Sequence, residues 1–550
     1  MRKNFLSNRI ILFILLIVIH SLFLLPLLPP GVPHTHDNEV NIARTAAYYQ
    51  AFVDGHVPPR WAGNLNYGYG IPVLVFFYPL PGYIGSFLHM IGFSFQNAYK
   101  IILATAFVGA PVTFFLWSSL RWKPSVAFII SILYGLAPYH FLNMYVRGDI
   151  GELAGYAIAP LVFWAVEKYL HKPSLTTILT GSIFYGLLVL AHNVVSLLFS
   201  PIILGYALWK YHQNHKSFAL VFFMLALGLG MSAFFWMPSL FELRYTNSTF
   251  FFGSIYREHF PSLIKLVYAA WGFGPDVNKV GGLSPQLGPL LTLLTVLGMV
   301  SAWRTHKVKN LHAFWTIVFF VSLFLVLPIS APIWQQLSLL KKFPFPWRFV
   351  GVTTFAGVLL AGFFFEKIKS RYVIFIFTLL AIVLSVTMAR VQGYLNVPDS
   401  YYQNYPATTD YHGATSTIWT AGFASSFPKQ PIEIISGTAT ISDYTRTTTR
   451  HAFTVHAQSQ TTVLDNTFYY IGWKTSIDGK NVPIEFQDPN HRGLITFIVP
   501  PGEHSVTVAF TETKVRMLAN AISLLFLGFV IVLFGMSLRS RPWREWQSLK

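Results

Sequence analysis

The sequence predicts a polytopic α-helical membrane protein with about twelve transmembrane helices and a β-sandwich-like insert, on the outer side of the membrane, before the last helix. Its 550 residues are 53% hydrophobic and only 11% charged, with a mean hydropathy of +0.50, whereas about a quarter of the residues of a soluble protein are charged. Apolar runs approach the roughly 20 residues that a helix needs to cross the hydrocarbon core. Short clusters of Lys and Arg separate these runs, as in the cytoplasmic loops of membrane proteins.

The charge and the lack of cysteine exclude several classes of function. The net charge is +18, but the basic clusters recur once per pair of helices and are not gathered on one domain. They therefore indicate membrane orientation and not nucleic-acid binding. The chain contains no Cys, which excludes disulfides, thiolate metal sites and thiol catalysis.

The first apolar run is longer than the core of a secretory signal and no A-x-A-like cleavage site follows it, so we expect a retained first helix. Joining the apolar runs through the basic clusters places the chain in the cytoplasmic membrane with both termini in the cytoplasm. The segment 72–92 is interrupted by Pro72, Pro79 and Pro81 and is predicted to be an interfacial or re-entrant helix on the outer face. The predicted spans are 9–29, 97–120, 125–142, 153–170, 175–192, 194–209, 217–237, 286–303, 311–328, 348–366, 372–390 and 516–538.

Three regions follow from this topology. Residues 1–390 form a transmembrane domain whose first outer loop is 30–96. Residues 391–515 form an extracytoplasmic β-rich domain, because the composition changes to Thr, Ser, Tyr and Asn and the pattern to short alternating strands. Residues 516–550 supply the final transmembrane helix and a basic cytoplasmic tail. The turn signals between the predicted strands are Asp478-Gly479 and Pro501-Gly502.

The most unusual outer residues follow the first helix, in "PPGVPHTHDNEVNIARTAAYYQAF". Apolar residues after Asp37 recur at helical spacing, which predicts a helix on the membrane surface. One interpretation is that Asp37 only caps this helix. Against it, His34, His36, Asp37 and Glu39 crowd into six residues at an interface where such groups are costly unless hydration or function keeps them. A partly dehydrated carboxylate has a raised pKa and could take a proton from a hydroxyl acceptor.

The same stretch offers ligands for a divalent metal. His34, His36 and Asp37 are suitable ligand types, but three residues make a poor site without support from elsewhere in the chain. We therefore predict no metal and no other cofactor, and regard His36 as a substrate-binding candidate.

Further candidates for substrate binding lie on the same face. Arg60, Trp61 and Asn66 combine a guanidinium, a ring and an amide that suit an anionic head group or a sugar. The alternative is an aromatic belt with a lipid-anchoring Arg. His192 ends a helix on the outer side, and its alternative role is that of a satisfied packing residue.

Two arginines could receive a phosphate. In "YVRGDIGE", Arg147 could bind it, while Asp149 or Glu152 could bind sugar hydroxyls or orient Arg147; the alternative is an Arg–Asp pair that stabilises the loop. Trp347 and Arg348 enter a helix from outside, where a basic group has the wrong sign for a cytoplasmic loop. They are candidates for binding a lipid phosphate, with head-group anchoring as the alternative.

Several stretches resemble known membrane proteins. The N-terminal stretches "HDNEVNIARTAAYYQAFVDGHVPPRWAGNLNYGYG" and "LYGLAPYHFLNMYVRGDIGELAGYAIAPLVFW" resemble bacterial and archaeal membrane proteins described as 6-pyruvoyl-tetrahydropterin synthase-related. The closing "YYIGWKTSIDGKNVPIEFQDPNHRGLITFIVPPGEHSVTVAF" and the helix after it resemble the C-terminal part of YfhO-like proteins. No domain like the soluble zinc-dependent synthase is visible, so pterin chemistry is given no weight.

The resemblance implies a fold of the GT-C class of membrane glycosyltransferases. Such enzymes take a sugar from a polyprenyl-phosphate carrier at the outer face and use an acidic residue of the first outer loop as catalytic base. Asp37 matches that position, with Glu39 in reserve. The expected partners are the lipid-linked donor and an extracytoplasmic glycan or protein acceptor, with no nucleic acid.

Two other functions stay open. A transporter or flippase for a lipid-linked sugar would show an internal repeat and charges near the membrane midplane, and no convincing repeat is seen. A non-catalytic envelope scaffold, with a β-domain that binds carbohydrate or protein, would tolerate Asp37→Asn but not deletion of 391–515.

Overall fold

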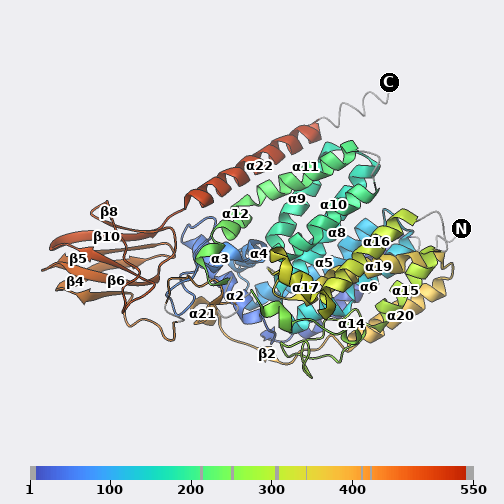
Figure 1. Cartoon of the computed structure of the whole chain (residues 1–550), viewed down its shortest axis with the longest axis horizontal. Helices are drawn as coiled ribbons and strands as arrows, with labels where there is room; N and C mark the ends of the chain where they lie inside the picture. The colour runs from blue at the N-terminus through green and yellow to red at the C-terminus, as the bar shows by residue number, and fades with distance from the viewer. Residues whose placement is uncertain are drawn as a thin grey trace.

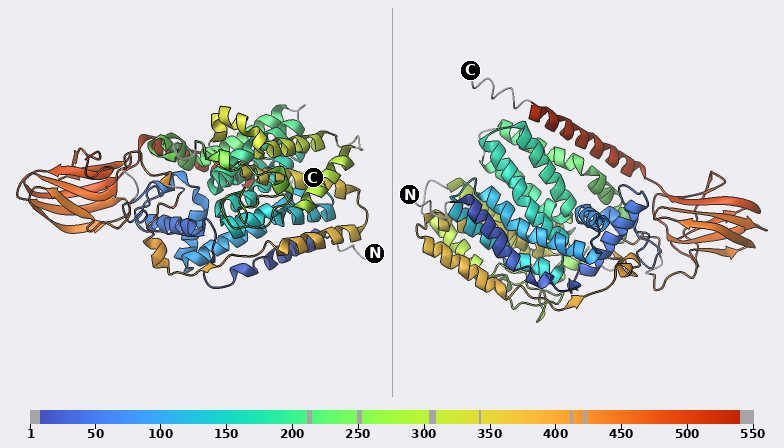
Figure 2. Two further views of the ribbon diagram at one scale, coloured as in Figure 1. Left: turned by 60° about the horizontal axis from the view of Figure 1, so that its bottom comes forward. Right: turned by 180° about the vertical axis from the view of Figure 1, so that it is seen from behind.

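The computed structural model describes residues 8–210, 215–248, 253–303, 309–341, 343–410, 413–420 and 424–539. A bundle of helices makes up most of the molecule, and a β-sandwich projects from one end of it (Figures 1 and 2). Both ends of the chain lie toward the opposite end of the bundle. The start of the predicted basic flank and most of the basic tail lie outside the described residues.

Helices of three kinds occupy the predicted spans. Within the described ranges, five are long and apolar enough to cross a membrane. They are α5 (Phe95–Ser118), α8 (Ile150–His171), α10 (Asn193–Lys210), α19 (Phe349–Lys367) with the turn before it, and α22 (Lys514–Arg539). Three further candidates are bent pairs: α6 (Pro124–Gly135) with α7 (Pro138–Phe141), α11 (His215–Met231) with α12 (Ala233–Phe241), and α16 (Lys309–Val326) with α17 (Ala331–Gln336).

The structure therefore supports a less exact number of membrane crossings than the predicted twelve. The described part of the chain has five candidate spans, or up to eight if each bent pair is one span. The remaining predicted ranges hold shorter apolar helices, namely α1 (Arg9–Leu22), α9 (Leu175–Ala191), α15 (Pro289–Trp303) and α20 (Arg371–Val386). These fall short of the roughly 20 residues that a straight span needs, so the count of twelve is not confirmed and stays a prediction.

The first outer loop folds against the bundle. It contains α2 (Asn38–Val53), α3 (Val73–Phe76) and α4 (Pro79–Met90). Proline begins α4, where its missing N–H costs nothing. A Cβ at Gly82 would lie 2.2 Å from the ring of Tyr48, so this glycine lets α4 approach α2 closely. The predicted helix after Asp37 is confirmed, but most of its residues are buried.

Short elements connect these helices. They are η2 (Leu25–Leu27), the π-helical turn η3 (Leu142–Arg147), η4 (Leu243–Tyr245), η5 (Ile255–Glu258), α14 (Leu263–Val267), η7 (Pro328–Ser330), α18 (Ser338–Lys341) and η8 (Pro346–Arg348).

The predicted outer β-rich region forms two antiparallel sheets. One has the order β4-β5-β10-β7-β8 and the other β3-β6-β9, and inward-facing residues of both, such as Val455, Val506 and Phe497, share one apolar core. Asp478 and Gly479 both have positive φ, at 51° and 78°, in the turn between β7 and β8, as their sequence signal predicts. The strands are β3 (Ile432–Ser436), β4 (Ala439–Arg446), β5 (Arg450–Ala457), β6 (Thr461–Phe468), β7 (Trp473–Ile477), β8 (Lys480–Val482), β9 (Leu494–Val499) and β10 (Gly502–Phe510).

The sandwich begins later than residue 391. Residues 394–410, which we name the strap, run along the first outer loop instead of joining the sheets. The strap contains β2 (Tyr394–Leu395), which pairs with β1 (Val32–Pro33), and α21 (Asp399–Gln403). It thus ties the insert to the region around Asp37.

A buried ion pair lies where the sandwich meets the helices. It contacts the sandwich through the Tyr470 hydroxyl, which donates to Glu242 at 3.3 Å, and the Ile471 carbonyl, which accepts from Arg516 at 3.1 Å. Arg516, at the start of α22, donates to one Glu242 carboxylate oxygen from Nε at 3.0 Å and Nη2 at 2.8 Å, and both side chains are almost fully buried. Nearby, Arg60 donates to the Phe234 carbonyl at 2.6 Å and to Asn520 at 2.9 Å. The ring of Trp61 packs edge-on against Trp473 in the sandwich core, with 5.5 Å between centroids.

Removing the cation of this pair should loosen the sandwich from the helices. Arg516→Met leaves the Glu242 carboxylate buried without its guanidinium, which typically costs about 3–5 kcal/mol. We expect a clearly lower thermal unfolding temperature for the purified protein in detergent. Lys480→Met, at an exposed position in β8, is the control, and equal unfolding temperatures for the two variants would contradict this role.

Candidate functional site

A tight turn at the start of α8 fixes the central residues of the site. Gly148 follows η3 in a left-handed conformation with φ of 69°. A Cβ at this position would lie 2.2 Å from Thr35 Oγ1 and 2.5 Å from the Tyr99 hydroxyl, so only glycine fits. Asp149 then caps α8, because its Oδ1 accepts from the backbone N–H of Glu152 at 2.9 Å.

This turn places two carboxylates around one guanidinium. Arg147 donates to Asp149 Oδ2 at 2.8 Å from Nη2 and to Glu152 Oε2 at 2.6 Å from Nη1. The hydroxyls of Tyr78 and Tyr139 donate to the other oxygens of Asp149 and Glu152, at 3.0 and 2.5 Å. The exposed fractions of Arg147, Asp149 and Glu152 are 4%, 3% and 0%. Each buried charge is thus paired and hydrogen-bonded, as burial requires.

A second guanidinium lies against the same carboxylates but is not bonded to them. Arg348 Nε is 3.4 Å from Glu152 Oε2, and Nη2 is 3.7 Å from Asp149 Oδ2. Among the described residues the Arg348 guanidinium donates no hydrogen bond, and its buried Nε has no hydrogen-bond partner. The Arg147 guanidinium carbon lies 4.6 Å from the centroid of the Trp347 ring. The buried Nε1 of Trp347 also has no hydrogen-bond partner within the described chain. Both terminal nitrogens of Arg147 thus donate hydrogen bonds, whereas the Arg348 guanidinium and the Trp347 ring donate none to the described residues.

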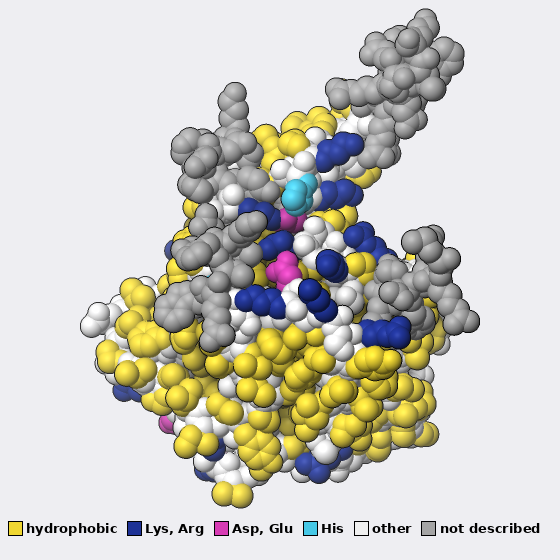
Figure 3. All heavy atoms as spheres, turned by 90° about the vertical axis from the view of Figure 1, so that its right-hand side faces the viewer, with side chains coloured by type: hydrophobic (Ala, Val, Ile, Leu, Met, Phe, Trp, Pro, Cys, Tyr) yellow, Lys and Arg dark blue, Asp and Glu magenta, His cyan; other side chains and the backbone are white. Residues whose placement is uncertain are grey.

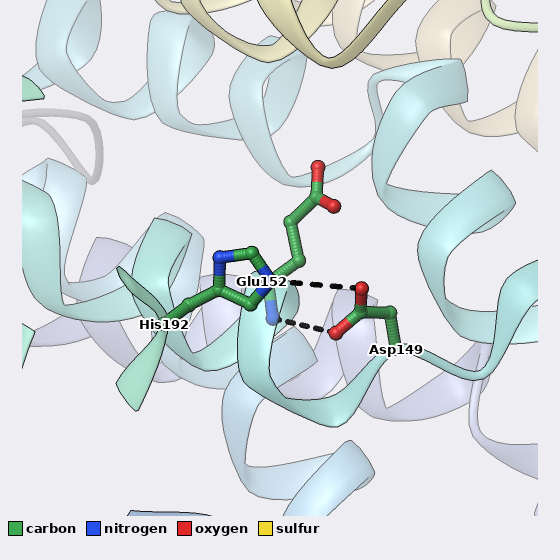
Figure 4. Close-up of side chains that lie close together, drawn as sticks. All are labelled: Asp149, Glu152 and His192. Atoms are coloured by element: carbon green, nitrogen blue, oxygen red, sulfur yellow. Dashed lines mark hydrogen bonds and ion pairs between the residues drawn. The ribbon is translucent and has the colours of Figure 1, made fainter. Parts of the chain in front are cut away.

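His192 completes this group of charges, which we name the ion cluster: Arg147, Asp149, Glu152, His192 and Arg348. Its Nδ1 accepts from the backbone N–H of Val195 at 3.2 Å, so in the neutral ring the proton lies on Nε2. That atom is 3.8 Å from Asp149 Oδ2 (Figure 4).

Three members of the ion cluster could in principle hold a metal. Ligand atoms of Asp149, Glu152 and His192 lie within 4.8 Å of one another, and these are ligand types that divalent ions use. Both carboxylates, however, already share the charge of Arg147 and face Arg348. A metal ion would meet two guanidiniums at close range, so this arrangement favours an ion-paired cluster, and the absence of a metal stays a prediction.

Asp37 lies beside the ion cluster, and its carboxylate accepts no hydrogen bond from the described residues. Its backbone N–H donates to the Arg147 carbonyl at 2.8 Å, and Asn41, one turn later, donates to the Gly148 carbonyl at 3.1 Å. Although Asp37 occupies the N-cap position of α2, its side chain makes no capping hydrogen bond, so capping alone does not account for it. Burial raises the pKa of the Asp37 carboxyl, and the Arg147 guanidinium offsets only part of this effect.

The other predicted residues are placed less centrally. The exposed His36 donates from Nε2 to the Phe273 carbonyl at 2.6 Å, and Glu39 accepts from the Tyr401 hydroxyl of the strap at 2.7 Å. The structure does not bring Arg60, Trp61 or Asn66 to the ion cluster. Arg60 bonds α12 and α22, Trp61 packs into the sandwich core, and the backbone N–H of Asn66 donates to the Ala407 carbonyl of the strap at 3.0 Å.

Sequence reasoning missed Arg44, which is buried at the centre of this region. It donates to Asn41 at 3.1 Å and to Thr409 of the strap, its guanidinium carbon lies 3.6 Å from the centroid of the Phe77 ring, and its charge interacts with Asp37. The spacing of Asp37, Asn41 and Arg44 places all three on one face of a helix, which could have revealed it. Nothing in the sequence points to Thr409, which lies 365 positions away.

Comparison with known proteins identifies a family. Residues 74–397 match the family model described as 6-pyruvoyl-tetrahydropterin synthase related domain, membrane protein. A protein of Lactococcus lactis subsp. cremoris (strain MG1363), described only as uncharacterized, is 24% identical over 253 residues, which are 44% of this chain and 41% of that protein. The chain thus matches less than half the length of this relative.

Two kinds of solved structure overlap with the chain in part. The arabinofuranosyltransferase AftD from mycobacteria superposes on 68% of this chain and 26% of its own, with 12% identity and a TM-score of 0.46. The oligosaccharyltransferase of Archaeoglobus fulgidus, tethered to an acceptor peptide, covers 74% of this chain and 56% of its own, with 13% identity and a TM-score of 0.41. Overlaps of this size do not carry an argument about function.

Replacing the turn glycine should disturb the site. Gly148→Ala adds a Cβ against Thr35 and Tyr99 at a positive φ, and such strain costs roughly 1–3 kcal/mol. We expect reduced thermal stability together with faster proteolysis of the first outer loop. The control is Gly109→Ala, where a Cβ would make an ordinary contact of 3.6 Å with Ala157; if the two variants behave alike, the turn does not need glycine.

Proposed function

The chain belongs to the 6-pyruvoyl-tetrahydropterin synthase-related family of membrane proteins, and we propose that it is a membrane glycosyltransferase that transfers a sugar from a polyprenyl-phosphate carrier to an acceptor outside the cell membrane. The observation that carries the proposal is the Asp37 carboxylate, which accepts no hydrogen bond from a described residue and lies beside Arg147, together with the half-buried Arg348, whose guanidinium faces Asp149 and Glu152 without bonding to them. A base and an anion site held by the same ion cluster are what this transfer needs.

The proposed orientation places the sandwich and the ion cluster outside the cytoplasmic membrane, both termini inside, and twelve spans between them. Figure 3 supports it, because Lys and Arg gather on the end of the bundle that faces away from the sandwich, above a broad hydrophobic surface. Basic side chains of this kind mark the cytoplasmic side.

In the proposed reaction Asp37 takes the proton from an acceptor hydroxyl. The hydroxyl oxygen forms a bond to the anomeric carbon of the sugar, and the bond from that carbon to the phosphate oxygen breaks. The polyprenyl phosphate leaves with the electron pair, and Arg348 with the Trp347 N–H binds the negative charge that develops. Arg147, whose two terminal nitrogens bond the carboxylates, acts as a positioning residue that holds Asp149 and Glu152.

Losing the base should abolish transfer. In membranes supplied with a radiolabelled polyprenyl-phosphate sugar, Asp37→Asn should lower the transfer rate by about 10²–10⁴, the usual contribution of a general base. Glu503→Gln, which changes an exposed carboxylate of the sandwich, is the control at equal expression. If Asp37→Asn transfers sugar like the control, the catalytic proposal fails and the transporter and scaffold alternatives gain support.

The pH profile should report the same carboxyl. A base acts when deprotonated, so activity is present above the pKa of Asp37 and is lost as the pH falls through it. Because burial raises this pKa, the acid limb of kcat/KM should lie above the ordinary range of an Asp, roughly 4. An acid limb at or below that value would show that Asp37 does not control the rate.

A further inference from the structure

We infer that the strap forms the acceptor subsite and that Asp410 binds a hydroxyl of a carbohydrate acceptor there. This inference rests on the proposed function, because it assigns the second substrate of the same reaction. It concerns a segment that is distant in the sequence, since Thr409 lies 365 positions from Arg44. The fold brings this segment into contact with the first outer loop.

The strap is fastened closely to the first outer loop. Tyr401 donates to Glu39 at 2.7 Å, and Asn64 donates to the Gln403 carbonyl at 3.0 Å. Arg44 donates to both the carbonyl and the hydroxyl of Thr409. The strap is therefore a fixed wall of the region around Asp37.

Thr409 is held in an unfavourable conformation. Its φ is 67°, a left-handed value that is uncommon for residues other than glycine and is retained where the surroundings determine it. Here the buried Arg44 supplies that constraint through two contacts with Thr409. The result is that the next residue, Asp410, is presented toward the same guanidinium, whose charge interacts with both Asp37 and Asp410.

Asp410 has one bound oxygen and one unused oxygen. Oδ2 accepts from the backbone N–H and the hydroxyl of Thr415. Oδ1 is buried and accepts no hydrogen bond of good geometry from a described residue, although the neighbouring Thr408 hydroxyl interacts with this carboxylate. Buried polar atoms without a partner are rare in native proteins and call for an explanation, and a ligand that donates a hydrogen bond provides one.

The chemistry favours a neutral hydroxyl as this donor. The nearby guanidinium of Arg44 would repel an acceptor group with positive charge, whereas it would not repel a neutral sugar hydroxyl. Tyr401 and Tyr405, whose rings lie edge-to-face at 5.6 Å, add aromatic surface in the strap next to Glu39. Arg348 and Trp347, which are proposed to bind the sugar donor, come instead from the turn before α19. Asp37 interacts with the ion cluster and also with Arg44, so it lies between the two proposed substrate sites.

The test separates acceptor binding from donor chemistry. Membranes with a radiolabelled polyprenyl-phosphate sugar yield both free sugar, by transfer to water, and labelled envelope product. Asp410→Asn replaces one carboxylate oxygen by an amide NH₂ group of the same shape. This variant should lower the ratio of envelope product to free sugar by about 10-fold or more, while donor consumption stays measurable. Asp37→Asn should lower both products together.

Asp443→Asn is the matched control, because it makes the same change at an exposed position of β4 in the sandwich. It should retain the wild-type product ratio. An unchanged ratio in Asp410→Asn would overturn the inference, as would loss of both products in that variant or a labelled product that protease destroys. If the wild type consumes no donor at all, the proposed function itself fails, and this result is distinct from a failure of the acceptor assignment alone.

Discussion

The buried pairing of Arg147 with Asp149 and Glu152 is the interaction on which the candidate site depends. Charges buried this completely are tolerated only when they are paired and hydrogen-bonded, and here each carboxylate has a guanidinium and a tyrosine hydroxyl. The geometry requires the left-handed Gly148, and the carbonyls around it hold the start of α2. Through these contacts one short turn sets the position of Asp37.

Around this pairing the molecule combines segments that are far apart in sequence. The first outer loop supplies Asp37 and Arg44, the turn before α8 supplies Arg147, which is bonded to both carboxylates, and the turn before α19 supplies Arg348, whose guanidinium donates no hydrogen bond to the described residues. The strap closes the opposite side, and the sandwich is anchored separately by Arg516 and Glu242. This difference between the two arginines is what distinguishes a group that can bind an anion from a structural ion pair.

Much of this arrangement could be predicted from sequence, because a hydrophobic environment makes polar residues conspicuous. Asp37, Arg147 and Arg348 stand out against apolar runs, and the structure brings them together. Arg60 and Trp61 also stand out in the sequence, but the sequence does not give their partners. Arg60 bonds α12 and α22, and Trp61 packs into the sandwich core. Thr409 and Asp410 carried no signal, since their role depends on a left-handed backbone and on a helix hundreds of residues away. The count of twelve membrane crossings is not confirmed, because hydropathy does not reveal where a helix bends or ends early, and the described residues hold five to eight candidate spans.

The most direct test of the central claim is the affinity of the purified protein, in lipid nanodiscs, for a short-chain polyprenyl phosphate. A hydrogen-bonded charge contributes about 1.5–3 kcal/mol, so Arg348→Ala should weaken binding by roughly 10-fold to 150-fold. Arg244→Ala, which removes an exposed arginine, should leave the affinity unchanged. Equal affinities of Arg348→Ala and the wild type would contradict the assignment of Arg348 as the phosphate site.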